Sequence, residues 1–433
     1  YTGEDTLSLH DALPICMNPI PDLLIPHQER QQIIKNLHKY RSWDLTQRQI
    51  CDVELLLNGG FYPLQGFLTY DDYTSVCQHM RLQSGELWPI PITLDVNEIY
   101  ASDVHIGETI VLRDIEGVPL ATLTVASKWK ADKELEAKLV FATNDTLHPG
   151  VNYLYNQCGN WYIGGKVQGL QLPIHYDYEE HRHTPNEIRK LFAKSGWNKI
   201  VAFQTRNPMH RAHFELTLRA AKAAQANLLL HPVVGMTKPG DIDYYTRVRC
   251  YEHVIQKYPQ QTAVLSLLPL AMRMAGPREA LWHALIRKNY GATHFIIGRD
   301  HAGPGNDSLG KPFYAPYAAQ ELVSKYNSEI GITVIPFLAI SYIENKKEYL
   351  PYDEIEPSDA VLDISGTEFR RRLLNGLEIP DWFSFAEVIN ELKATHPSKN
   401  KQGFTIFFTG LSGAGKSTIR SEERRVGKEC LRL

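Results

Sequence analysis

The feature that most constrains the fold is a regular alternation of short apolar runs and longer segments between residues 199 and 337. Each run is short enough for a buried strand, and each intervening segment is long enough for a helix. Repeated strand, crossover helix and strand predict a doubly wound parallel sheet, an α/β fold whose ligands bind at the carboxyl ends of its strands. The apolar runs are KIVAF (199–203), NLLLHPVV (227–234), TAVLSLLP (262–269), THFIIG (293–298) and ITVIPF (332–337).

The chain before this region predicts a mostly β domain, a small barrel. Its β-rich runs are WPIPITLDV (88–96), ETIVLRD (108–114) and PLATLTVAS (119–127), separated by glycine and proline. The aromatic and glycine-rich stretch 59–68 fits a tight turn with aromatic anchors packed on the barrel. A ligand site there is the alternative, and core packing is favoured.

The two ends of the chain do not suit the fold. Residues 1–16 precede the first methionine, and residues 420–433 carry no periodicity that continues what comes before. Both resemble translated adaptor sequence, so we exclude them from the fold and expect an internal fragment of a longer reading frame. The expected domains are a β-rich domain (17–177), an α/β domain (178–337), a smaller helical part (338–397) and the truncated start of a further domain (398–419).

Composition excludes several classes of protein. A chain of 433 residues exceeds what one core usually covers, so two or three domains are expected. The apolar content of 43% and the net charge of −3 predict a folded protein with neither a nucleic-acid nor a membrane partner. Six cysteines without a C-x-x-C pair predict reduced thiols, and no apolar run reaches the length of a membrane span. We therefore expect a cytoplasmic protein.

A polar string directly follows KIVAF (199–203), the first apolar run of the predicted parallel sheet. It is QTRNPMHRAH (204–213), with an alanine-rich helix expected from there to about residue 225. Pro208 suits a helix entry, which would place His210 and His213 three residues apart on one helix face. An H-x-x-H pair alone carries little weight, since about 0.7 such pairs are expected by chance. The complete string is specific: a helix N-terminus attracts phosphate, and imidazoles can donate hydrogen bonds to phosphoryl oxygens.

Three segments in order closely resemble the ATP sulfurylase (sulfate adenylyltransferase) family of the nucleotidylyltransferases. They are QTRNPMHRAHFEL (204–216), MRMAGPREA (272–280) and GRDHAGPG (298–305), supported by GFYPLQGFL (60–68) and ISGTEFRRRL (364–373). The resemblance covers about residues 18–395. It implies a PUA-like β domain over 17–177, a nucleotidylyltransferase catalytic domain over 178–337 and a C-terminal helical part of the catalytic region over 338–397. Taken alone, the third segment could be a glycine-rich turn and the second an apolar loop before a helix with Pro277 at its start.

The resemblance implies a role for individual residues. Gln204, Thr205, Arg206 and Asn207 would form the active loop, in which the last three are catalytic and Arg206 grips sulfate. His210 and His213 would stabilise the transition state at the α-phosphate. Gly298, Arg299, Asp300 and His301 would hold ATP, Ala302 would meet sulfate through its backbone, and Ile340, in PFLAISY (336–342), would lie near the adenine.

The implied reaction is attack by a sulfate oxygen on the α-phosphorus of ATP, in line with departing pyrophosphate, in sulfate assimilation. Positioning and charge stabilisation matter more here than a general base, because sulfate has no proton to remove near neutral pH. Magnesium would arrive with the ATP phosphates, and no protein-held metal is predicted. Asp241 and Asp243 could face it through water, although helix-capping carboxylates are favoured. The expected partners are ATP, sulfate and further copies of the chain in a homo-oligomer.

Two other functions remain open: transfer of the nucleotidyl group to another acceptor, such as a phosphopantetheine-type substrate, and non-catalytic nucleotide binding.

A second phosphate motif follows the apolar run FTIFF (404–408). GLSGAGKS (410–417) matches the P-loop pattern, in which Gly410 and Gly415 shape the loop, Lys416 reaches phosphate and Ser417 meets magnesium. It resembles the start of adenylylsulfate kinase, so a bifunctional parent is expected. We expect no kinase activity from the short segment that follows. A fungal-type inactive regulatory domain is the rival interpretation, which the intact G-K-S disfavours.

Overall fold

The computed structural model describes residues 19–337, 339–398, 401–403, 409–415 and 418. The end segments 1–16 and 420–433, the strand expected at 404–408, and the P-loop residues Lys416 and Ser417 lie outside the described residues. The chain divides into two compact units. The first comprises Tyr1–Ile364 and Pro380–Glu391, and the second comprises Ser365–Ile379 and Leu392–Leu433. No helix within the described residues has the length and apolar character needed to cross a bilayer.

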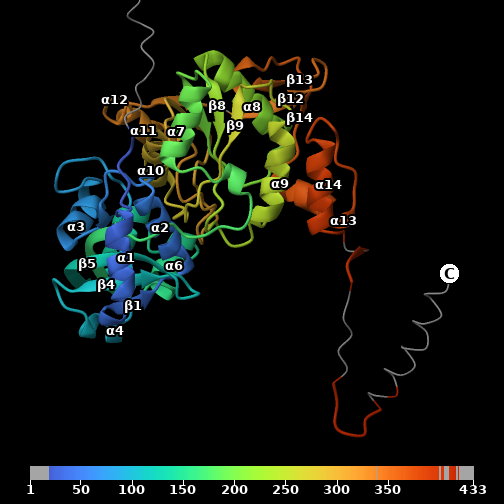
Figure 1. Cartoon of the computed structure of the whole chain (residues 1–433). Coiled ribbons are helices and arrows are strands. Elements are labelled where there is room, and N and C mark those ends of the chain that lie inside the picture. The colour runs from blue at the N-terminus through green and yellow to red at the C-terminus, as the bar shows by residue number, and fades with distance from the viewer. Residues whose placement is uncertain (1–18, 338, 399–400, 404–408, 416–417, 419–433) are drawn as a thin grey trace, which may run out of the picture. The chain divides into compact units, whose positions relative to one another are not determined.

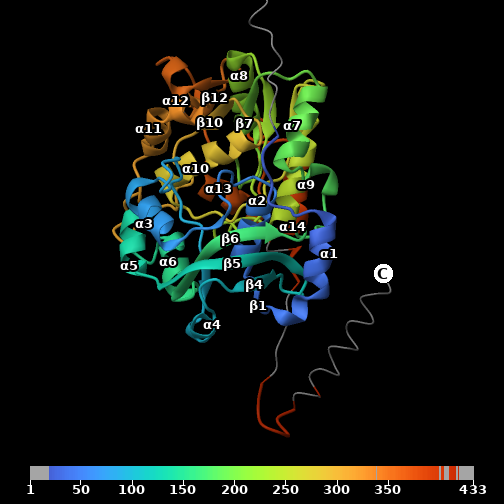
Figure 2. The same ribbon diagram turned by 60° about the vertical axis from the view of Figure 1, so that its left-hand side comes forward.

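The N-terminal part of the first unit is built on a six-stranded sheet in the order β1-β4-β5-β6-β2, with β3 beside β6 (Figure 2). Only the β1–β4 pair is parallel among the strand pairs of this sheet in the described chain. The strand expected at 88–96 is reduced to its last three residues, because Pro89 and Pro91 cannot donate ladder hydrogen bonds. The strands are β1 (Arg41–Asp44), β2 (Gly66–Phe67), β3 (Leu94–Val96), β4 (Thr109–Arg113), β5 (Pro119–Lys130) and β6 (Trp161–Gly169).

Helices accompany this sheet to an extent that the sequence analysis did not predict. In α2, burial includes Gln49, Asp52 and Glu54 as well as the apolar residues, so no one-sided apolar stripe marks the helix. A capping box between Thr46 and Gln49 fixes its start. The helices are α1 (His27–Lys35), α2 (Gln47–Leu57), α3 (Tyr70–His79), α4 (Glu98–Asp103), α5 (Lys133–Glu136) and α6 (Pro149–Asn156), with short turns η2 (Leu37–Lys39) and η3 (Ala137–Phe141).

The predicted doubly wound parallel sheet is confirmed, in the order β11-β10-β7-β8-β9. Figure 1 shows β8 and β9 of this sheet side by side. The second and third strands, β8 and β9, end earlier than their apolar runs. For β8 the reason is Pro232, which lacks the N–H that would continue the strand. The strands are β7 (Ile200–Phe203), β8 (Asn227–Leu230), β9 (Ala263–Leu265), β10 (His294–Ile297) and β11 (Thr333–Pro336). The helices around them are η4 (Glu179–His181), α7 (Pro185–Lys194), α8 (Arg211–Ala224), α9 (Tyr244–Ile255), α10 (Gly276–Asn289), α11 (Ala318–Lys325) and α12 (Asn327–Ile330).

The region after β11 corrects the expectation of a purely helical segment over 338–397. Residues 340–362 form a three-stranded antiparallel sheet in the order β13-β12-β14. Its strands have at most four residues, too few to show a clear period. They are β12 (Ile340–Ile343), β13 (Glu348–Pro351) and β14 (Val361–Leu362), with a short turn η5 (Tyr352–Glu354). The helical character expected of this region appears in α14 (Ala386–Thr395).

In the second unit, α13 (Gly366–Asn375) begins after its N-cap residue Ser365. Ser365 Oγ accepts a hydrogen bond from the Glu368 amide at 3.2 Å. The Glu368 carboxylate holds Arg371 and Arg372. The described P-loop residues Gly410 and Gly415 are exposed.

One hydrophobic core runs through the six-stranded and the five-stranded sheets of the first unit. Phe61 lies 5.6 Å from Trp88 and 5.2 Å from Trp282 of α10, measured between ring centroids. Phe67 and Leu68 are also buried, whereas Tyr62 is exposed. The packing interpretation of the stretch 59–68 is therefore confirmed for its two phenylalanines, and Phe61 joins the N-terminal part to the part built on the parallel sheet.

Candidate functional site

The candidate site lies where the strands of the parallel sheet end. β7 pairs in parallel with both β8 and β10, so the segments after these three strands share one edge. These segments are 204–210, 231–243 and 298–305. The two motifs that the sequence analysis selected, Gln204–His213 and Gly298–Gly305, therefore follow neighbouring strands.

The first of these segments, 204–210, is a turn whose backbone is held by side-chain hydrogen bonds. Thr205 Oγ1 accepts a hydrogen bond from the Asn207 amide at 3.1 Å. The Tyr251 hydroxyl donates to the Asn207 carbonyl at 2.8 Å, and Arg247 donates to the carbonyl of Arg206 at 3.1 Å. The turn is thus supported from α9, which leaves the Asn207 side chain exposed.

Arg206 is held by a carboxylate from the next loop. Its Nη1 lies 2.5 Å from both oxygens of Asp241. Asp241 also accepts the Lys238 amide at 3.1 Å, and Lys238 Nζ donates to the carbonyl of Pro304 at 2.7 Å. These contacts connect the loop after β8 with the turns after β7 and β10. Asp241 is therefore an ion-pair partner and not an exposed cap, whereas Asp243 is the N-cap of α9, as expected.

The two histidines mark the start of α8. His210 is the N-cap and His213 is in the first turn; Pro208 lies three residues before the first helical residue, so it does not open the helix. His213 Nδ1 accepts a hydrogen bond from the His210 amide at 3.3 Å, which places the His213 proton on Nε2. Burial lowers the pKa of His210 to about 3, helped by His213, and that of His213 to about 4. Both rings are neutral near pH 7.

The GRDHAGPG turn has a strained backbone and borders a cavity. Asp300 and Ala302 have φ of 54° and 53°, a region that residues other than glycine rarely adopt. Arg299 and Asp300 are exposed and pair with each other at 3.2 Å. The cavity is lined by the turn from Arg299 to Asn306 except Ala302, and by Pro277, Pro312, Tyr314, Ala315, Pro316 and Ala319.

Ile340 is less directly connected to these segments. It opens β12, three residues after Phe337, whose amide donates to the Ile297 carbonyl at the end of β10. It lies beyond the same edge of the sheet, and its role near adenine stays a prediction. Gly410 and Gly415 belong to the other compact unit.

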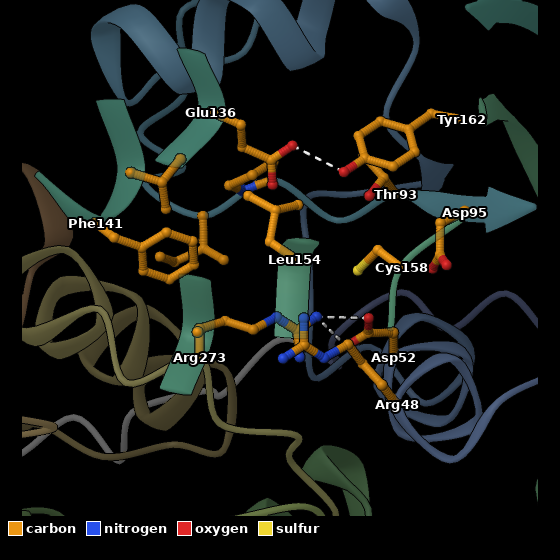
Figure 3. Close-up of a pocket in the computed structure, with 14 residues that line it drawn as sticks. Arg48, Asp52, Thr93, Asp95, Glu136, Phe141, Leu154, Cys158, Tyr162 and Arg273 are labelled. Carbon is orange, nitrogen blue, oxygen red and sulfur yellow. Dashed lines mark hydrogen bonds and ion pairs between the residues drawn. The ribbon is translucent and has the colours of Figure 1, made fainter. Parts of the chain in front are cut away.

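The two arginines of the MRMAGPREA segment (272–280) have structural roles. Arg273 is buried and bound to Asp52 at 2.6 and 2.8 Å, as Figure 3 shows. Arg278 donates to the backbone carbonyls of Val76, Cys77 and Pro89. Pro277 lies in the first turn of α10, as the apolar-loop interpretation expected. These arginines fasten the catalytic part to the N-terminal part.

The sequence analysis missed several side chains beside the candidate site. Lys238 lies in the segment KPGD (238–241), whose proline and glycine indicate a loop. The sequence does not reveal which groups Lys238 contacts. Glu279 and His283 are buried in α10, and Tyr314 borders the cavity. Glu279 lies within the MRMAGPREA segment but was given no role, and no motif includes His283 or Tyr314. Only the fold brings them to the site, since they are distant in sequence from residues 204–213.

Comparison with known proteins places this geometry in a family. A family model for ATP-sulfurylase matches residues 179–395, and one for a PUA-like domain matches residues 16–172. The chain belongs to the ATP-sulfurylase family. The resemblance stated from its motifs, and the PUA-like character of its N-terminal part, are confirmed.

Curated members of the ATP-sulfurylase family extend beyond this chain. It is 56% identical to a sulfate adenylyltransferase of Mycosarcoma maydis over 87% of the chain and 66% of the relative. It is 56% identical to that of Schizosaccharomyces pombe over 84% of the chain and 74% of the relative. A solved structure described as hexameric APS kinase from Thiobacillus denitrificans matches with a TM-score of 0.78 and 35% identity, over 94% of this chain and 74% of that one.

Proposed function

We propose that this chain is a sulfate adenylyltransferase, which joins sulfate to the α-phosphate of ATP and releases pyrophosphate. The proposal rests mainly on the position of two motifs, which follow neighbouring parallel strands at the same edge of the sheet. An arginine loop and a helix N-terminus follow β7, and the GRDHAGPG turn follows β10. This arrangement offers two adjacent positions for anions.

In the proposed reaction, a sulfate oxygen attacks the α-phosphorus and the bond to the pyrophosphate oxygen breaks on the opposite side. Arg206 would orient sulfate, with Asp241 holding Nη1 of the guanidinium. His213, with its proton on Nε2, can donate to a phosphoryl oxygen. The N-terminus of α8 adds positive potential where charge develops. Neither histidine needs to accept a proton.

Magnesium would bind mainly through the phosphates of ATP. Asp300 is an exposed carboxylate in the candidate ATP turn and could meet the hydrated ion, whereas the oxygens of Asp241 are engaged by Arg206. When bound with ATP, the ion would neutralise phosphate charge.

Sulfate-dependent exchange of pyrophosphate into ATP tests the function. Arg206→Ala should reduce the exchange about 100-fold or more, because a charged group that stabilises the reacting centre is lost. Arg113→Ala, which removes an exposed arginine of β4, is the matched control and should retain activity. Exchange supported by another acceptor but not by sulfate would contradict the proposal, as would ATP binding without exchange.

Three expectations accompany the proposal. A homo-oligomer is proposed, since the Thiobacillus structure is described as hexameric. Cytoplasmic location and the absence of kinase activity stay predictions. A kinase assay on the same preparation, with adenosine 5′-phosphosulfate and ATP, would check the last of these.

A further inference from the structure

A buried chain of three polar side chains lies behind the candidate ATP turn. His301, in that turn, has its Nε2 3.0 Å from Nδ1 of His283 on α10. Nε2 of His283 lies 3.3 Å from Oε1 of Glu279, one helical turn earlier. Glu279 and His283 are fully buried. None of the sequence motifs assigns a role to Glu279 or His283.

The carboxylate at the inner end of the chain is charged. Glu279 accepts the backbone amides of Arg273 at 2.9 Å and Ala275 at 2.7 Å. Burial alone would raise the pKa of Glu279, but the nearby His283 ring and the hydrogen bonds from these amides bring it below its ordinary value.

The two imidazoles are neutral. Burial lowers the pKa of His283, and it lowers that of His301 further because His283 and Arg287 lie nearby. Other titratable groups also face the chain. Arg287 on the same helix and His231 after β8 lie near the imidazoles. His148, Arg273 and Tyr314 lie near Glu279.

These charges fix where the protons lie. Nε2 of His283 faces the charged Glu279 carboxylate at 3.3 Å without meeting the geometry of a hydrogen bond. A hydrogen on Nε2 is attracted by that carboxylate, whereas a lone pair there would be repelled, so we place the His283 proton on Nε2. Its Nδ1 is then an acceptor, and the hydrogen between the rings must belong to Nε2 of His301. The remaining nitrogen of His301, Nδ1, has a lone pair and no hydrogen.

We propose that Glu279 and His283 are positioning residues that hold His301 as the neutral Nε2–H tautomer, with Nδ1 presented as an acceptor to the nucleoside of ATP. His301 lines the cavity beside the turn. A phosphate oxygen has no hydrogen to give to Nδ1, whereas a ribose hydroxyl or an adenine amine has one. This inference rests on the proposed function only for the identity of the nucleotide.

Nitrogen NMR of the full chain, labelled with ¹⁵N-histidine, tests the tautomer directly. The His301 ring signals are assigned by their loss in His301→Gln. We expect Nε2 to have the shift of a protonated nitrogen and Nδ1 that of an unprotonated one, without and with ATP. A proton on Nδ1, or a doubly protonated ring, would overturn the proposal. The wild-type spectrum decides this without any variant at His283.

Two variants of similar size then separate the hydrogen bond from packing. His283→Asn keeps an amide oxygen near the position of Nδ1, and His283→Leu removes every acceptor. The Leu variant should bind ATP about tenfold more weakly by calorimetry and lose the single tautomer, whereas the Asn variant should remain within about twofold of wild type. Equal affinities for the two variants would contradict the proposal. Since neither measurement needs sulfate, a missing exchange activity would count against the function and not against this tautomer.

Discussion

At the scale of single residues, the candidate site depends on partners that no local pattern reveals. Arg206 could be selected from its motif, but Asp241, 35 residues later, could not be recognised as its partner. That pairing exists only because the loops after β7 and β8 end at one edge. The histidine pair was predictable from its spacing, whereas its neutral state follows from burial in the fold.

Asp241→Asn should weaken sulfate binding. The variant removes the charge that holds Nη1 of Arg206, so the guanidinium must be ordered by sulfate itself. The KM for sulfate should rise about tenfold, while the KM for ATP changes less than threefold. Steady-state exchange kinetics with each substrate varied measure both constants. A larger effect on ATP than on sulfate would contradict this assignment.

His231 predicts a specific dependence of stability on pH. It is fully buried, and neither ring nitrogen makes a hydrogen bond within the described residues. Burial lowers its pKa well below the ordinary value, while the unfolded chain keeps about 6.5. The unfolded state therefore binds more protons between these values, so the free energy of unfolding falls as the pH drops below about 6.5.

Replacement of His231 by phenylalanine should remove this pH-dependent contribution to the free energy of unfolding. Urea unfolding at pH 7.5 and 5.5 should show a pH-dependent loss of stability that is about 1.4 kcal/mol smaller in His231→Phe than in wild type. His79→Phe, on the exposed end of α3, is the control and should keep the wild-type difference. Identical pH dependence in wild type and His231→Phe would rule the mechanism out.

At the scale of elements, the apolar runs predicted the parallel sheet because its strands are buried on both faces. Prediction failed where that simple signal was absent. The proline residues at 89 and 91 shortened an expected strand, and α2 buries polar as well as apolar residues. The strands of the sheet over 340–362 are too short to show a period.

The first turn of α10 depends on a glycine. Gly276 has φ of +50°, and a Cβ there would lie 2.3 Å from the ring of Tyr314, which lines the cavity. Gly276→Ala should therefore displace Tyr314 and raise the KM for ATP about tenfold or more. Gly196→Ala is the control, since its φ is +68° but no atom lies within 4 Å of the added carbon. It should cost about 1 kcal/mol of stability without changing the KM.

At the scale of the whole molecule, the N-terminal and catalytic parts are one compact unit with a shared core. The sequence predicted two or three domains from length, and a boundary near residue 177 from a change in pattern, but not the charged cluster between the N-terminal and catalytic parts. Arg48, Asp52 and Arg273 meet there, on one side of a small cavity whose opposite side carries the buried carboxylate of Glu136 (Figure 3). Such a cluster combines residues from segments that are each unremarkable in sequence.

Asp52→Asn should destabilise the whole unit. The variant leaves Arg273 buried without its carboxylate partner, which costs about 3 kcal/mol or more. Arg81→Ala breaks an exposed ion pair with Glu329 between the same two parts and should cost less than about 1 kcal/mol. Equilibrium urea unfolding compares the two variants. Similar losses for both would mean that the buried pair has no special role.

The contacts of Arg278 have a consequence for how such proteins diverge. Its guanidinium binds main-chain carbonyls, which every residue type provides. At that junction the catalytic part recognises the path of the N-terminal backbone and is indifferent to which side chains that backbone carries. Point mutations around Val76 to Pro89 can accumulate without loosening this attachment, whereas an inserted or deleted residue there would break it. Tolerance of substitution combined with intolerance of length change is the evolutionary signature to expect at this join.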